Sequence, residues 1–182
     1  MATKNIQFHD LSVNQNTDGK DLQLIFETQV AIDLQTRTKI IAILNTTLAD
    51  TLDLQTQTKF AHWNVKGNDF HQLHLLFDQT AEHLEDWVDM LAERATALGG
   101  RANGTLRQAA AASSMMEYPL ETVKGMDHVR ALSYRLGTLG NIYRESIDKC
   151  NDLRDQATAD LYTELTRKAD QDLYFLESHI QV

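Results

Sequence analysis

The chain has 182 residues, a formal net charge of −9, one proline and one cysteine. This length suits a single domain with its own core, and one proline leaves no room for a proline-rich linker. One cysteine excludes an intramolecular disulfide, and the negative charge disfavours nucleic acid and anionic lipid as partners while it attracts cations. The composition therefore predicts a single all-α domain.

The first 20 residues are polar and contain only two lysines, Lys4 and Lys20. They lack the apolar core of a signal peptide, and no later stretch reaches the roughly 20 apolar residues of a membrane span. We assign residues 1–20 to a flexible polar tail and residues 21–182 to one domain. We expect a cytoplasmic protein without a membrane partner, and association with the nucleoid stays open.

Hydrophobic periodicity, together with the positions of glycine and proline, predicts four long helices and one short one. The expected ranges are about 31–65, 70–98, 105–113, 126–151 and 156–180. The short helix falls in the long connection between the second and third long helices. Such a connection is typical of the crossover in a four-helix bundle.

The second predicted helix has an acidic face. At about 100° per residue, its polar side chains share one stripe and its apolar side chains lie opposite. Acidic helix faces are usually just solvated, and that alternative stays open. However, no Lys or Arg lies between His71 and Asp89, so the helix itself does not balance this charge. The stripe consists of His74, Asp78, Glu82, Glu85, Asp89 and Glu93.

The spacing within this stripe indicates two half-sites for a metal. His62, at the end of the first helix, lies beside His74 and Asp78 in an antiparallel hairpin. Asp78 and Asp89 are eleven residues apart, which is about 16 Å along a helix and too far for one site. Two copies crossing antiparallel near His83 would pair the halves, and histidine with carboxylate suits iron. Each shared site would take His62, His74 and Asp78 from one chain and Asp89 and Glu93 from the other.

Several motifs resemble the Dps family, the mini-ferritins named as DNA-binding proteins from starved cells. They are HWNVKG from His62, DMLAERATALGG from Asp89, YPL, TADL and FLESHI, and they extend over nearly the whole chain after the tail. The resemblance implies a ferritin-like four-helix bundle with a short extra helix between helices two and three. It also implies assembly into a hollow homo-dodecamer of 23 symmetry.

In that family the ferroxidase centre lies at the two-fold interface, and its ligands correspond to the five residues of the shared site above. The resemblance thus implies two iron ions per centre, oxidised from Fe(II) to Fe(III) preferentially by hydrogen peroxide, with zinc or another divalent metal as a substitute. Storing the ferric mineral would protect DNA and the cell from oxidative stress. Trp63 matches a family residue thought to donate electrons, and interface packing is the alternative.

The TADL segment places an acidic residue where the family lines its iron-entry pores. Asp160 matches such a position, and Asp152 and Asp155 are weaker candidates. The alternative for Asp152 and Asp155 is an acidic helix N-terminus stabilised by the helix dipole.

DNA binding is the competing function, and we predict that it is weak or absent. Family members bind DNA through tails rich in lysine or arginine, whereas this tail offers two lysines on a chain of net charge −9. In a gel-shift assay with supercoiled plasmid at neutral pH and moderate salt, the plasmid should migrate unchanged. A tight complex at stoichiometric protein would contradict this prediction.

Overall fold

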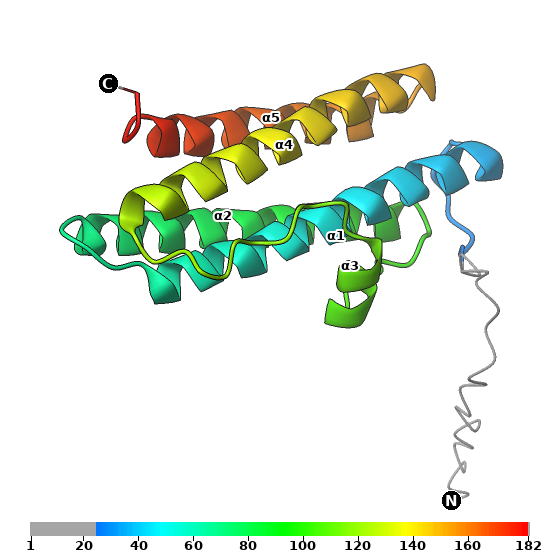
Figure 1. Ribbon diagram of the computed structural model, residues 1–182. Coiled ribbons are helices and arrows are strands. Elements are labelled where there is room, and N and C mark those ends of the chain that lie inside the picture. The colour runs from blue at the N-terminus through cyan, green and yellow to red at the C-terminus, as the bar shows by residue number, and fades with distance from the viewer. Residues whose placement is uncertain (1–24, 182) are drawn as a thin grey trace, which may run out of the picture.

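The computed structural model describes residues 25–181, which form five helices and no strand (Figure 1). This confirms the predicted all-α bundle with an extra short helix. The predicted tail, residues 1–20, lies outside the described residues. Within the described range, no helix combines the length and apolar composition that a membrane span needs. The helices are α1 (Leu34–Asn64), α2 (Phe70–Ala97), α3 (Leu106–Ala112), α4 (Gly125–Asp152) and α5 (Gln156–Glu177).

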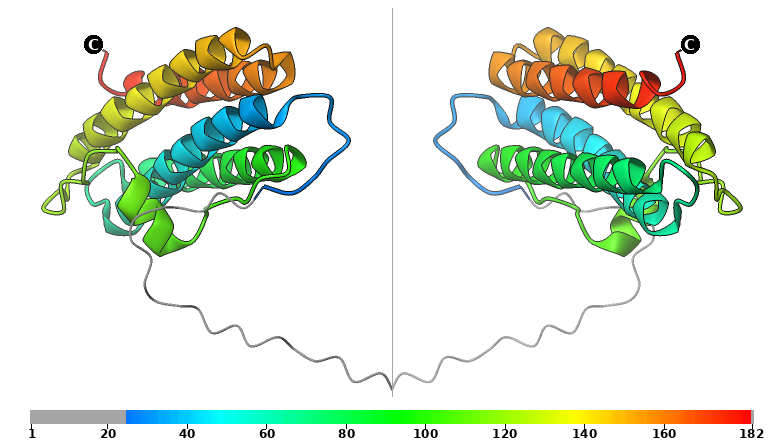
Figure 2. Two further views of the ribbon diagram at one scale, coloured as in Figure 1. Left: turned by 90° about the vertical axis from the view of Figure 1, so that its right-hand side faces the viewer. Right: turned by 90° about the vertical axis from the view of Figure 1, so that its left-hand side faces the viewer.

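The bundle consists of two stacked helical hairpins, α1 with α2 and α4 with α5 (Figures 1 and 2). The connection from α2 to α4 runs along α1 and carries α3 on its outer side. Two predicted bounds were wrong by about a turn. α1 begins at Leu34 because the Asp33 side chain caps it by accepting from the Thr36 amide, and α5 ends at Glu177 instead of residue 180.

The core lies between the hairpins and is filled by large side chains. Trp87 and Phe77 from α2 and Tyr143 from α4 are almost fully buried. Burying an aliphatic or phenyl side chain stabilises the fold by about 1.5–3 kcal/mol. These apolar contacts fix α2 with its acidic stripe turned away from the core.

A buried ion pair joins α2 to the start of α5. Arg94 donates to both carboxylate oxygens of Asp155 at 3.0 Å and to the Thr158 hydroxyl at 2.8 Å. Asp155 is 3% exposed and caps α5 by accepting from the Thr158 amide. Burial opposes ionisation, but the hydrogen bonds from Thr158 and Arg94 outweigh it and hold the pKa of Asp155 below its usual 3.8.

We predict that Asp155→Ala lowers the free energy of unfolding by about 3 kcal/mol at pH 7. The substitution removes the N-cap of α5 and leaves the Arg94 guanidinium without its carboxylate partner. The folded-state pKa lies below 3.8, so this stabilisation is present above that pH and is lost as the pH falls through the folded-state value. Urea unfolding at pH 7 and in acid measures both effects. Asp152→Ala is the exposed control and should change stability by less than about 0.5 kcal/mol; equal losses would contradict the assignment.

Candidate metal centre

His62 and His74 hold the α1–α2 hairpin together through each other's main chain. The Nδ1–H group of His62 donates to the His74 carbonyl at 2.8 Å, and that of His74 donates to the His62 carbonyl at 2.9 Å. The two rings stack with centroids 3.7 Å apart. A carbonyl oxygen only accepts, so Nδ1 carries the hydrogen in both rings and each Nε2 keeps a lone pair for a metal.

The turn that brings these histidines together is short. α1 ends at Asn64 and α2 begins at Phe70, and Gly67 adopts a φ of 121° between them. Glycine tolerates positive φ without steric cost, so the chain can reverse within a few residues. Asp69 is the N-cap residue of α2, but its carboxylate accepts from the Gln72 side chain rather than from the helix main chain.

Asp78 completes the first half-site and has a cation partner that the sequence argument missed. The Lys59 ammonium group lies 2.5 Å from Asp78 Oδ1, and His62 Nδ1 lies 3.7 Å from the same oxygen. The hydrogen bond from Lys59 is the main cause that holds the pKa of Asp78 below its usual value. The charge that balances Asp78 comes from α1, three residues before His62, and not from α2 itself.

The second half-site lies three turns further along α2. Asp89 and Glu93 are exposed, and among residues 25–181 neither side chain forms an ion pair. The described residues contain no group of three or more His, Cys, Asp or Glu side chains placed to hold a metal. This includes His62, His74 and Asp78, which are neighbours in one chain but are not arranged there as a complete metal site. Asp89 and Glu93 lie further along α2.

Exposed apolar side chains surround the first half-site. Trp63 is 65% exposed, Leu75 53% and Phe70 40%. Large apolar side chains gathered around polar groups are typical of surfaces that another protein covers. The indole of Trp63 does not pack into its own bundle, so electron donation and packing against a partner both stay open.

The three pore candidates separate by exposure. Asp152 and Asp160 are exposed, whereas Asp155 is buried in the cap and ion pair described above. The geometry of Asp155 favours the helix-terminus alternative for that residue. Its pairing with Arg94 could not be read from α5, because Arg94 is far away in sequence.

Two other histidines have partners that the sequence did not reveal. His83 Nδ1 lies 2.9 Å from Asp172 Oδ2 across the α2–α5 seam, and His128 Nδ1 lies 2.7 Å from the Tyr118 hydroxyl. Burial raises the pKa of Asp172, and the hydrogen bond with His83 offsets part of that rise. His83 and Asp172 belong to different helices, and Tyr118 lies in a connection outside the helices, so helical periodicity carries no signal for either pair.

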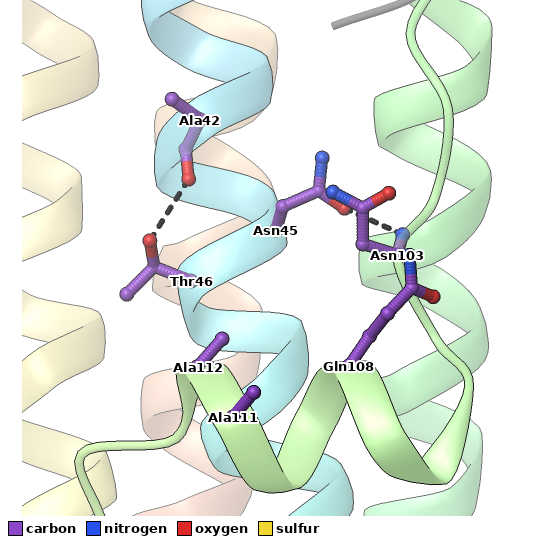
Figure 3. A pocket seen from close by; sticks show the side chains of 7 residues that line it. All are labelled: Ala42, Asn45, Thr46, Asn103, Gln108, Ala111 and Ala112. Carbon is purple, nitrogen blue, oxygen red and sulfur yellow. Dashed lines mark hydrogen bonds between the residues drawn. The ribbon is translucent and has the colours of Figure 1, made fainter. Parts of the chain in front are cut away.

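A cavity of about 400 Å³ lies between α1 and α3, away from these residues (Figure 3). It exists because α3 presents alanines to α1, and Asn45 accepts from the Asn103 amide at its edge. Its lining contains none of the predicted site residues: Ala42, Asn45, Thr46, Asn103, Gln108, Ala111 and Ala112.

Comparisons with known proteins agree with this fold and its motifs. Residues 41–182 match the family model of the ferritin-like domain. The DNA protection during starvation protein of Agrobacterium fabrum is 39% identical over 145 residues, which cover 80% of this chain and 90% of that protein. DpsA14 from Streptomyces coelicolor has a TM-score of 0.83 at 27% identity and covers 88% of this chain and 95% of its own. An archaeal Dps homologue from Halobacterium salinarum has a TM-score of 0.82 at 26% identity and covers 93% and 94%.

Lys59 and a metal compete for the same carboxylate, so we predict that Lys59→Met tightens metal binding. Pairs as exposed as Lys59–Asp78 contribute about 0.2–1 kcal/mol, which corresponds to about 1.5- to 5-fold in affinity. Titration of the metal-free protein with Co(II) at pH 7 measures the change. Lys149→Met is the matched control, because Lys149 pairs only with exposed Glu145; weaker binding by Lys59→Met would show that the lysine assists the metal.

Proposed function

The chain belongs to the Dps family of ferritin-like proteins, and on that premise we propose that it is an iron-storing ferroxidase. It oxidises Fe(II) to Fe(III), preferentially with hydrogen peroxide, and holds the ferric product inside a hollow homo-dodecamer of 23 symmetry. Iron is the substrate of this reaction, and zinc or another divalent metal can occupy the same ligands. We place the protein in the cytoplasm, where removing Fe(II) and peroxide together protects DNA.

One observation carries this proposal: the five candidate ligands form two incomplete half-sites on a single hairpin. His62, His74 and Asp78 converge at one end of α2, and Asp89 and Glu93 lie exposed further along it. Two hairpins related by a two-fold axis would bring the first half-site of each chain to the second half-site of the other chain. The exposed apolar side chains around the first half-site support a partner chain at this surface.

The residues present fit iron as a substrate. The free Nε2 atoms of His62 and His74 and the carboxylates are ligands that Fe(II) accepts, and carboxylate oxygens favour Fe(III). When iron binds, the Asp78 carboxylate must give up its ion pair with Lys59 and bind the metal instead. In the metal-free protein, the Lys59 ammonium group therefore occupies the place of a cation beside Asp78. The main-chain hydrogen bonds of both histidines hold their rings in place during this exchange.

Iron also needs an entry path. We assign the exposed Asp160 to a pore, with Asp152 as a second acidic group near the same end of α5. Asp155 stays a weaker member of this set, since its carboxylate already binds Arg94.

A complementation experiment tests the shared site. One variant, His74→Ala with Asp78→Ala, removes the first half-site, and a second variant, Asp89→Ala with Glu93→Ala, removes the other. Each variant by itself should lose rapid Fe(II) oxidation by peroxide, measured as ferric absorbance in stopped flow. When both are co-expressed, random mixed dimers regain one intact centre, so we expect about a quarter of wild-type centres to recover.

Co-expression of either variant with itself is the control, and circular dichroism checks that each one folds. Absence of recovery in the mixed sample would contradict a centre shared between chains. Wild-type rates in the Asp89→Ala, Glu93→Ala variant would contradict the ligand assignment itself.

A further inference from the structure

Tyr118 and His128 form a buried hydrogen-bonded pair outside the candidate centre. The Tyr118 hydroxyl lies 2.7 Å from His128 Nδ1, and the two residues are 7% and 0% exposed. The other ring nitrogen of His128, Nε2, has no hydrogen-bond partner among the described residues. A phenol facing an imidazole at this distance can pass its proton directly to the ring.

The other two buried tyrosines lack such a base. The hydroxyl of Tyr143 lies 2.7 Å from the hydroxyl of Thr51, and that of Tyr162 lies 2.7 Å from the hydroxyl of Thr47. A threonine hydroxyl does not take up a proton near neutral pH, so neither phenol is hydrogen-bonded to a base. Tyr134 and Tyr174 are exposed. Among the five tyrosines, Tyr118 therefore differs by having a base in place.

The pair lies next to the first half-site through two phenylalanines. The Phe60 ring centroid is 5.3 Å from that of Tyr118, and Phe60 follows Lys59 in α1. The Phe77 ring centroid is 6.2 Å from that of His128, and Phe77 precedes Asp78 in α2. Tyr118 and His128 thus pack against residues that neighbour the half-site in sequence. His128 is fully buried, and Tyr118, in the α2–α4 connection, lines a surface pocket together with Phe60.

We propose that Tyr118 and His128 form a redox-active pair that gives one electron to peroxide when the centre holds too little Fe(II). This rests on the ferroxidase function proposed above and adds a residue to it. Reduction of hydrogen peroxide to two waters takes two electrons and two protons. A centre with a single Fe(II) supplies one electron, and Tyr118 supplies the other.

The electron and proton of Tyr118 leave in different directions. The electron goes to the peroxide oxygen, and the hydroxyl proton moves to His128 Nδ1, which leaves a neutral tyrosyl radical beside an imidazolium. The two protons that complete the waters come from solvent. A later Fe(II) returns an electron to Tyr118, His128 returns the proton, and the iron leaves as Fe(III). Hydroxyl radical is not released, because both electrons reach the peroxide.

The surroundings make the proton transfer necessary. The Arg135 guanidinium carbon lies 5.1 Å from the centroid of the Tyr118 ring, so a positively charged tyrosine there would be repelled. Loss of the proton to His128 removes that charge from the ring. Burial lowers the pKa of His128, so the imidazole is neutral before oxidation and can accept.

The test uses the assembled full-length protein with less than one Fe(II) per centre, mixed with hydrogen peroxide and frozen within milliseconds. Electron paramagnetic resonance should show a tyrosyl radical, and ring-deuterated tyrosine should narrow its signal. Tyr118→Phe should lose the signal, whereas Tyr143→Phe and Tyr134→Phe, the buried and exposed controls, should keep it. His128→Gln keeps a hydrogen-bonding group but no base, and it should lower the radical yield at least about tenfold.

Several outcomes would contradict the proposal that Tyr118 and His128 are redox-active. They are a radical that survives in Tyr118→Phe, a signal unaffected by deuterated tyrosine, or an unchanged yield in His128→Gln. High-field spectra of the wild-type radical give a check that needs no variant, because a hydrogen bond from imidazolium lowers its largest g value. The assay with two Fe(II) per centre tests the ferroxidase function separately. Normal development of ferric absorbance in Tyr118→Phe would leave the proposed ferroxidase function intact. Absence of ferric absorbance in the wild-type protein would contradict that function.

Discussion

The hydrogen bonds that His62 and His74 exchange with each other's main chain constrain the rest of the proposed chemistry. They fix the tautomer of both rings and set the end of α1 beside the start of α2. A ligand held by its neighbour's backbone loses little freedom when a metal arrives. The same contacts close the hairpin whose α2 carries the second half-site.

If the five candidate ligands form one centre, as we propose, the rigidity of α2 requires that two chains supply them. A continuous helix of 28 residues cannot fold back to bring Asp89 to Asp78, so the separation of about 16 Å persists whatever the side chains do. Antiparallel pairing of two such helices removes the separation without bending either one. In the proposed pairing, exposed Trp63 and Leu75 beside the first half-site would contact the partner chain.

Periodicity and turn chemistry predicted most of the fold. The number, order and approximate bounds of the helices were right, and glycines with positive φ, Gly67 and Gly99, follow the ends of α1 and α2. The contacts between helices were not predictable in this way. Lys59 reaches Asp78 and Tyr118 reaches His128 through pairings set by helix rotation and by the path of the α2–α4 connection, which a one-dimensional pattern does not contain. The pairing of the two half-sites stays a prediction, since it belongs to an assembly of chains.

The energies explain how one helix can carry so much uncompensated charge. Like charges four residues apart destabilise a helix by about 0.2–0.5 kcal/mol per pair, and α2 has such pairs at Glu85 with Asp89 and at Asp89 with Glu93. On the opposite side, Leu84 and Leu91 are each fully buried, and each stabilises the fold by about 1.5–3 kcal/mol. Core packing therefore exceeds this repulsion several-fold, so the acidic face around Asp89 is tolerated, while at Asp78 the Lys59 ammonium group supplies compensating charge. A bound cation would relieve the repulsion, so the charge that costs the free chain some stability also favours metal binding.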